Sequence, residues 1–247
     1  MPQQIESVAR SKEVADPAGG AIAAFIFDVD GVIADTATLH EAAWRQIARR
    51  EGIEIDAGTA QALRGTPRDA SLRLILGNRR VPLRRFNELM EEKNADYLRR
   101  VEALGPADVL PGTLALLDQL RSMGMGIAAA SASRNARRVL QQLQIDGRFD
   151  AIVDGADEAT SSAGLHRYLL AAGALRVAPG RCVVVEDSPT GVATARQFGM
   201  LTVGLGNGNA LCAASIVFES LRGVDASCLT TWLGGGASVG PAEFPAL

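Results

Sequence analysis

Two aspartates that lie one residue apart follow a short apolar stretch near the start of the chain. Residues 24–27 are all apolar, and Asp28, Asp30 and Gly31 come just after them. A run that is apolar at every position is typical of a strand buried on both faces of a parallel sheet. Side chains two residues apart in an extended segment point to the same side, so both carboxylates could reach one reacting centre. An acidic turn would give the same pattern, so this motif alone does not decide the chemistry.

Polar side chains also follow two other apolar stretches. Residues 182–185 lead into Glu186 and Asp187, while residues 126–130 lead into hydroxyl, guanidinium and amide groups: Ser131, Ser133, Arg134 and Asn135. Open α/β sheets place their active sites at the carboxyl ends of their strands. Carboxylate oxygens suit Mg²⁺, and hydroxyl and guanidinium donors suit phosphate oxygens. The three strand ends together predict a site for Mg²⁺ and a phosphate group.

Short apolar stretches alternate with helix-like segments, which predicts an α/β fold with a doubly wound parallel sheet. The strand candidates are residues 24–27, 126–130, 151–153, 182–185 and 201–203. The helix candidates among them are residues 113–121, 136–143 and 191–198. Between the first two strands lies a long interval with helical patterns at residues 40–50, 69–76 and 83–100. A connection of this length predicts an inserted α-helical domain rather than a loop.

The composition excludes several classes of protein. A net charge of -3 over 247 residues argues against an electrostatic nucleic-acid binder. No apolar stretch approaches the roughly 18 residues that span a membrane. The three cysteines show no metal or redox spacing, so we expect a cytoplasmic protein. Residues 1–20 lack an apolar signal core and are expected to form a disordered tail, and the glycine-rich residues 234–247 a flexible C-terminal tail.

Taken together, three motifs resemble those of the haloacid dehalogenase superfamily, and most closely its β-phosphoglucomutase-like subfamily. They are D-x-D-G-V-I-x-D-T at residues 28–36, S-A-S-[KR]-N at residues 131–135 and E-D-S-x-x-G at residues 186–191. The resemblance extends over residues 21–206. It implies a Rossmann-like core made of residues 21–37 and 105–233, with a helical cap domain at residues 38–104. Hinges are expected near Thr36 and at Gly105.

The resemblance also implies Mg²⁺-dependent phosphoryl transfer through an aspartyl-phosphate. Asp28 corresponds to the nucleophile, Asp30 to the general acid/base, and Ser131 to the hydroxyl that binds the transferring phosphate. The implied metal ligands are Asp28, the Asp30 carbonyl and Asp187, with Glu186 beside them. The implied substrate is a small sugar phosphate, and we expect a monomer with no nucleic-acid or membrane partner.

Residues of the expected cap carry the argument for a sugar phosphate. Thr36, His40 and Trp44 match a T-x-x-x-H-x-x-x-W motif of the mutases, and the last two share a helix face. The other implied substrate-binding residues are Gly65, Arg68, Ser71, Lys93, Asn94, Ser133, Arg134 and Asn135. Arg68 would hold the phosphate that is not transferred. Lys93 is one of only two lysines in the chain, so its presence in this segment favours a function.

At one position the chain departs from the family pattern. The family has a lysine that pairs with the nucleophile, and equal spacing between Asp154 and Asp187 places Ser162 there. Losing one preorganised charge contact costs on the order of 3 kcal/mol, or about a hundredfold in rate. His166 or Arg167 could replace it only if the loop is rearranged. We therefore expect weak activity and no cationic nitrogen within hydrogen-bonding reach of the nucleophile.

Three functions remain open from the sequence. The first is a β-phosphoglucomutase that interconverts β-glucose 1-phosphate and glucose 6-phosphate. The second is a sugar-phosphate phosphatase, in which water resolves the aspartyl-phosphate. The third is a catalytically weakened member that binds a sugar phosphate or a protein partner. The expected cap residues favour the mutase because a mutase must hold two phosphates at once, whereas the missing lysine favours the third function.

Overall fold

The computed structural model describes residues 20–161 and 163–235, and its centre is a parallel sheet of six strands. The strands are β1 (Ala24–Phe27), β2 (Gly126–Ala130), β3 (Ala151–Val153), β4 (Cys182–Glu186), β5 (Leu201–Leu205) and β6 (Ile216–Phe218). Their order across the sheet is β3-β2-β1-β4-β5-β6. β1 and β4 are therefore neighbours, and Phe27 pairs with Val185. This pairing brings the acidic residues that follow the two strands to the same edge.

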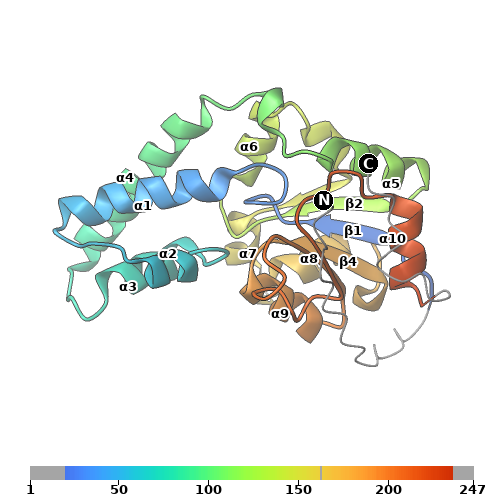
Figure 1. Cartoon of the computed structure of the whole chain (residues 1–247). Helices are drawn as coiled ribbons and strands as arrows, with labels where there is room; N and C mark the ends of the chain where they lie inside the picture. Colours follow the sequence, from blue (N-terminus) through green and yellow to red (C-terminus); the bar gives the residue numbers. More distant parts are fainter. Residues whose placement is uncertain (1–19, 162, 236–247) are drawn as a thin grey trace, which may run out of the picture.

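Helices cover both faces of the sheet because the central strands are apolar on both sides (Figure 1). Phe25 and Phe27 pack into one hydrophobic cluster and Ala24 and Ile26 into another. Among the residues of the first cluster are ones from α5 (Thr113–Ser122), α6 (Ala136–Gln142) and α10 (Ala226–Leu233). The second includes residues of α8 (Arg167–Ala174) and α9 (Pro189–Gln197). The alternation along β1 confirms the predicted doubly wound α/β fold.

Four further helices lie between β1 and β2 in the chain and project from the sheet (Figure 1). They are α1 (Thr36–Arg50), α2 (Ala57–Ala62), α3 (Arg68–Leu76) and α4 (Leu83–Val101), and we call them the cap helices. Trp44, Ile47, Leu72 and Leu89 belong to a hydrophobic cluster of their own. The division into core and cap domains near residues 38 and 104 stays a prediction, but this cluster supports it.

Local signals explain where α1 begins and ends. The Asp35 carboxylate accepts a hydrogen bond from the Thr38 amide and so satisfies one free donor of the first turn. Arg49 and Arg50 lie in the last turn, where positive charge is favourable to the helix dipole. Because α1 starts so soon after β1, its first residues remain next to the strand-end aspartates.

Some short helices and strands were not predicted from the sequence. They are β6, α8, α10, α2 and α7 (Gly155–Thr160), and the predicted ranges of β4 and β5 ended early. β6 has three half-buried residues at the edge of the sheet, and so few residues give no clear alternation. The three short 3₁₀ turns are Pro106–Asp108, Asp146–Arg148 and Pro179–Arg181. The expected tails lie almost wholly in residues 1–19 and 236–247, outside the described part of the chain.

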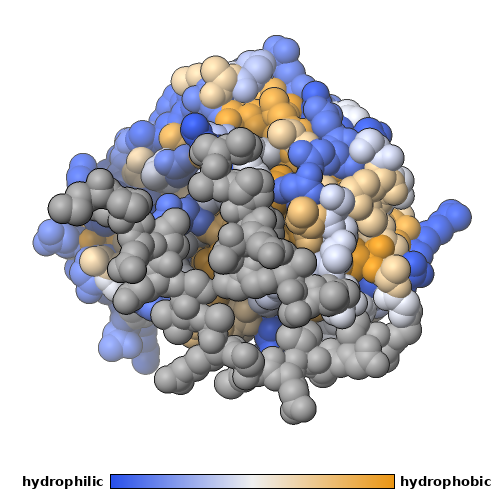
Figure 2. Space-filling model, turned by 45° about the vertical axis from the view of Figure 1, so that its right-hand side comes forward, coloured by the Kyte–Doolittle hydropathy of each residue, from blue (hydrophilic) through white to orange (hydrophobic). Residues whose placement is uncertain are grey.

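The surface is mixed in character. Figure 2 shows hydrophobic residues gathered in the upper part of one face, with hydrophilic residues around them. The large exposed hydrophobic side chains among the described residues are spread along the chain: Leu74, Leu83, Met123 and Leu165. Across residues 20–161 and 163–235, no helix combines the length and apolar character that crossing a bilayer demands.

Candidate active site

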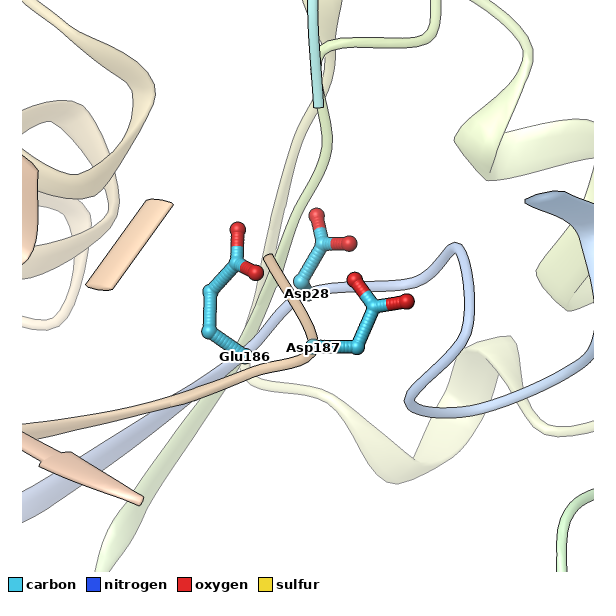
Figure 3. A group of neighbouring side chains, drawn as sticks. All are labelled: Asp28, Glu186 and Asp187. Carbon is cyan, nitrogen blue, oxygen red and sulfur yellow. The ribbon is translucent and has the colours of Figure 1, made fainter. Parts of the chain in front are cut away.

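Three carboxylates meet at the ends of β1 and β4. Asp28 follows β1, Glu186 ends β4 and Asp187 follows it, and each offers an oxygen within 4.8 Å of the others. Figure 3 shows the three side chains side by side above the strand ends. Asp28 and Glu186 are buried and Asp187 is half-buried. The sequence predicted this grouping, and the parallel pairing of β1 with β4 produces it.

The crowding of negative charge raises the pKa of two of these carboxyl groups, Asp28 and Asp187. Burial and then the charge of Glu186 raise the pKa of Asp28 well above its usual range, with a further contribution from Asp30. Burial and Glu186 also raise the pKa of Asp187 to about 7. A divalent cation would relieve this repulsion, and hard carboxylate oxygens are the ligands that Mg²⁺ prefers. The donor set therefore fits Mg²⁺.

Glu186 is held in one orientation by the residues around it. The Tyr168 hydroxyl donates to its Oε1 at 2.7 Å, and the Ser188 amide donates to its Oε2 at 2.6 Å. A Cβ on Gly191 would lie 1.8 Å from Oε1, so a side chain there would displace the carboxylate. The glycine of the E-D-S-x-x-G motif is therefore required by the close approach of α9 to Glu186.

Gly31 has a similar role beside Asp187. Its φ is +86°, a conformation that residues with a side chain rarely adopt. A Cβ at this position would lie 2.1 Å from Asp187 Oδ2. The glycine after the two aspartates thus turns the backbone away and leaves space for the acidic cluster.

Asp30 is oriented by two hydroxyl groups. Thr36 donates to its Oδ1 at 2.6 Å and Ser131 to its Oδ2 at 2.9 Å. His40 Nε2 lies 3.5 Å from Oδ1. Thr36 and Ser131, which were predicted to contact substrate and phosphate, therefore both contact the predicted acid/base in this structure.

Lys93 links α4 to this group. Its Nζ lies 2.5 Å from His40 Nδ1 and sits over the rings of Trp44 and Tyr97, at 4.9 Å and 4.8 Å from their centroids. Burial, and next the charge of Arg68, lower the pKa of Lys93 to about 7. Burial also lowers the pKa of His40 to about 3, so His40 is neutral near pH 7. The predicted residues His40, Trp44 and Lys93 are thus brought together with Asp30.

A cavity lies between the cap helices and the strand ends. From the core it is lined by Asp30, Asp187, Ser133 and Arg134. The predicted cap residues that line it are His40, Trp44, Gly65, Arg68, Ser71 and Lys93. Asn94 Oδ1 accepts hydrogen bonds from Arg68 and from Asn135, both at 2.8 Å, and so joins the cap helices to the core beside this cavity.

Two arginines, Arg68 and Arg134, add positive charge to the cavity. Burial and the nearby charge of Arg134 both lower the pKa of Arg68. Neither arginine forms an ion pair with a carboxylate in the described part of the chain. Like charges that share a cavity without acidic partners favour an anionic occupant such as a phosphate.

Several residues at the site were not predicted from the sequence. Arg64 Nη1 lies 3.1 Å from Asp187 Oδ2, although 123 positions separate them in the chain. Tyr97 stacks on His40, with ring centroids 3.8 Å apart, and Tyr168 holds Glu186. Only Tyr97 had a signal in the sequence, since it lies one helical turn after Lys93.

The position expected for the family lysine cannot be described, because Ser162 lies outside the described residues. Among residues 20–161 and 163–235, no lysine or arginine forms an ion pair with Asp28. Arg167 is nevertheless buried close enough to lower the pKa of Asp28.

Comparison with known proteins decides the family. Residues 22–199 match the model of the haloacid dehalogenase-like hydrolases. The chain belongs to this family. It is 38% identical over 198 residues to the β-phosphoglucomutase of Bacillus subtilis, a match that covers 78% of this chain and 88% of the relative. The chain is therefore an enzyme of the β-phosphoglucomutase-like type.

Other relatives show the range of activities near this chain. A crystal structure of β-phosphoglucomutase from Clostridium difficile is 35% identical and superposes with a TM-score of 0.81, covering 86% of this chain and 97% of that one. The fructose-1-phosphate phosphatase YqaB of Escherichia coli is 29% identical over 182 residues, which cover 72% of this chain and 93% of the relative. These similarities place the chain among sugar-phosphate phosphomutases and phosphatases.

Proposed function

We propose that this protein is a Mg²⁺-dependent β-phosphoglucomutase that converts β-glucose 1-phosphate into glucose 6-phosphate. The observation that carries the proposal is the distribution of charge in one cavity. Asp30 and Asp187 line it together with Arg68 and Arg134, and in the described part of the chain neither arginine has a carboxylate partner. A mutase must hold a second phosphate while the first is transferred, and a pair of arginines suits that phosphate.

In the proposed reaction, an Asp28 carboxylate oxygen forms a bond to phosphorus as the bond from phosphorus to the sugar oxygen breaks. Asp30 gives its proton to the departing sugar oxygen. It later takes a proton from the attacking hydroxyl, as that oxygen bonds to phosphorus and the bond from phosphorus to Asp28 breaks. Mg²⁺ would be held by Asp28, Asp187 and the Asp30 carbonyl, next to Glu186, and would offset the negative charge of the transferring group. The hydrogen bonds from Thr36 and Ser131 would keep the Asp30 carboxylate directed at the sugar oxygen.

The Lys93–His40 contact supports a role for the cap helices in this step. His40 lies between Lys93 and Asp30, so the position of α4 is transmitted to the acid/base group. We infer that Asp30 is correctly placed only when the cap helices are closed over the sugar. Water is then excluded from the aspartyl-phosphate while the sugar turns to present its other hydroxyl.

A sugar-phosphate phosphatase is the second candidate, and the similarity to YqaB favours it. Two assays run side by side separate the candidates. One measures glucose 6-phosphate formed from β-glucose 1-phosphate with Mg²⁺ and a catalytic amount of bisphosphate primer, and the other measures phosphate release. Mutase turnover well above phosphate release is expected. Predominant phosphate release would favour the phosphatase, and the absence of both products would favour the weakened, binding-only member.

The metal site has its own test. Calorimetry should show one Mg²⁺ bound by the purified protein, and Asp187→Asn should remove that binding because it neutralises a ligand. Asp69→Asn is the matched control, because Asp69 is an exposed aspartate of α3 away from the acidic cluster. Unchanged Mg²⁺ affinity in Asp187→Asn would place the ion elsewhere. The monomeric state remains an expectation that light scattering can check.

A further inference from the structure

The arginine that begins α8 is buried, and one of its donors has no partner among the described residues. The Arg167 side chain is 4% exposed, and its guanidinium carbon lies 4.9 Å from the centroid of the Tyr168 ring. Its Nη1 lies 3.0 Å from His166 Nε2 and 3.6 Å from Glu158 Oε2. Its Nε is buried and has no hydrogen-bond partner among the described residues.

Burying an arginine donor without a partner lowers the stability of the fold. Leaving a buried donor without a partner costs about 1–3 kcal/mol, and more when the group is charged. In a planar guanidinium, Nε and Nη2 share the edge whose two parallel N–H groups match a carboxylate or a phosphate. The polar contacts of Arg167 that the structure shows are made by Nη1, and Nε has no hydrogen-bond partner among the described residues, so this edge is open to a ligand.

Arg167 lies beside the acidic cluster. Its guanidinium packs on the ring of Tyr168, whose hydroxyl donates to Glu186 Oε1 at 2.7 Å, and Glu186 and Asp28 offer oxygens within 4.8 Å of each other. Burial lowers the pKa of Arg167, but Tyr168, Asp28 and Glu186 raise it by more, and Arg167 in turn lowers the pKa of Asp28. The guanidinium is therefore within electrostatic range of the proposed nucleophile, although the two do not form an ion pair. Burial and the adjacent Arg167 charge lower the pKa of His166 to about 4, so His166 adds no positive charge near pH 7.

We propose that Arg167 is a catalytic residue whose Nε edge binds oxygens of the transferring phosphoryl group next to Asp28. It would supply the positive charge that the family provides with a lysine and that this chain lacks at position 162. The inference rests on the proposed phosphoryl transfer and adds no bond to it. As the bond from Asp28 to phosphorus forms and the sugar oxygen leaves with the proton from Asp30, Arg167 stays protonated and offsets the charge of the phosphoryl oxygens.

The location of Arg167 favours this role over one in binding the sugar. Arg167 does not line the cavity between the cap helices and the core, whereas Arg68 and Arg134 do. It comes from α8, on the face of the sheet opposite to α5 and α6, and packs on Tyr168, which hydrogen-bonds to Glu186 of the acidic cluster. One arginine can thus serve the transferring phosphate while two others serve the second one. If Arg167 supplies the missing charge, wild-type turnover should be near normal, and not weak as the sequence alone predicts.

The test compares Arg167→Met and Arg167→Lys with the matched control Arg138→Met in the full chain. Arg138 is an exposed arginine of α6 that lies outside the proposed site. Two quantities are measured: turnover of β-glucose 1-phosphate, and the affinity for inorganic phosphate in the presence of Mg²⁺ by calorimetry. We expect Arg167→Met to lose about a hundredfold in turnover and at least about tenfold in phosphate affinity. The turnover and phosphate affinity of Arg167→Lys should lie between those of Arg167→Met and wild type, because lysine keeps the positive charge but lacks the two parallel N–H groups of a guanidinium.

A rescue experiment separates a catalytic from a structural role. Guanidinium chloride at millimolar concentration should restore part of the turnover of Arg167→Ala, and equal sodium chloride should not. Because guanidinium destabilises folds, rescue cannot come from improved folding. If Arg167→Met does not fold, Arg167→Lys decides, and phosphate affinity equal to wild type in that variant overturns the inference.

Failure of the inference differs from failure of the proposed function. If the wild type turns over and Arg167→Met is as active as Arg138→Met, the catalytic role of Arg167 is refuted and the proposed function stands. Absence of both products from wild type would refute the function. In that case the phosphate titration still tests whether Arg167 binds a phosphate. A loss of phosphate affinity in Arg167→Met supports this role, and an affinity equal to that of the wild type overturns it.

Discussion

Arg68→Ala should impair phosphate transfer between sugars far more than hydrolysis. Arg68 lines the cavity, donates to Asn94 at 2.8 Å and feels the charge of Arg134. A hydrogen bond to a charged group contributes about 1.5–3 kcal/mol, which corresponds to roughly 10- to 150-fold in affinity. Removing Arg68 also relieves its repulsion with Arg134. We therefore expect the lower half of that range, about tenfold to fortyfold.

The assay measures kcat/KM for glucose 6-phosphate formation beside the rate of phosphate release from the same sugar phosphate. Release should change little, because hydrolysis needs only the phosphate at Asp28. Arg80→Ala is the control, since Arg80 is exposed and has no ion pair among the described residues. An Arg68/Arg134 double-mutant cycle adds a check. Two arginines on one phosphate should be non-additive, as expected for residues that share a partner.

An equal loss of both activities would refute this reasoning. Arg68 would then act through its hydrogen bond to Asn94, which also binds Asn135 of the core, and so through closure of the cap helices. Asn94→Ala distinguishes the two explanations. If closure is what matters, this variant should reproduce the Arg68→Ala losses in both assays.

Three other outcomes follow from the site. Asp28→Asn should abolish turnover and leave the unfolding temperature without Mg²⁺ unchanged or higher, because burial and Glu186 raise the pKa of Asp28; appreciable residual turnover would remove it from the nucleophile role. Burial lowers the pKa of Lys93 to about 7 in the folded protein, whereas an unfolded lysine has a pKa of about 10.4. Between these two pH values the unfolded chain binds a proton that the folded protein has released. The free energy of unfolding in urea should therefore rise between about pH 7 and pH 10, and Lys93→Met should flatten that rise. Ser162→Lys should change turnover little if Arg167 supplies the charge, whereas the sequence alone predicts a gain of about tenfold to a hundredfold in steady-state assays.

The central sheet could be predicted because burial leaves a local trace. Residues 24–27 and 182–185 are apolar at every position, and the structure places alternate residues of β1 in two different hydrophobic clusters. The position of Asp28, Glu186 and Asp187 at one edge followed from the same pattern, because parallel strands end together. The glycines at positions 31 and 191 were visible in the motifs, although the clashes that require them were not.

The contacts of the site could not be predicted because they join distant parts of the chain. Ser131 and Asp30 are 101 positions apart and Arg64 and Asp187 are 123 apart, and no local pattern records either pair. The helix α8 was missed as well, since its eight residues follow a segment without strand or helix signals. The buried state of Arg167 followed from that helix packing against the sheet.

By itself, the sequence determined the type of fold and the kind of chemistry. Apolar periodicity and strand-end carboxylates depend on neighbouring residues, so they can be read along the chain. Only the tertiary structure decided the partners of each charged group. Whether a cation is solvated or buried beside a carboxylate depends on which elements pack around it, and this separates Arg167 from an ordinary arginine at the start of a helix. The same packing placed Arg68 and Arg134 in one cavity. The proposed function depends on this shared location.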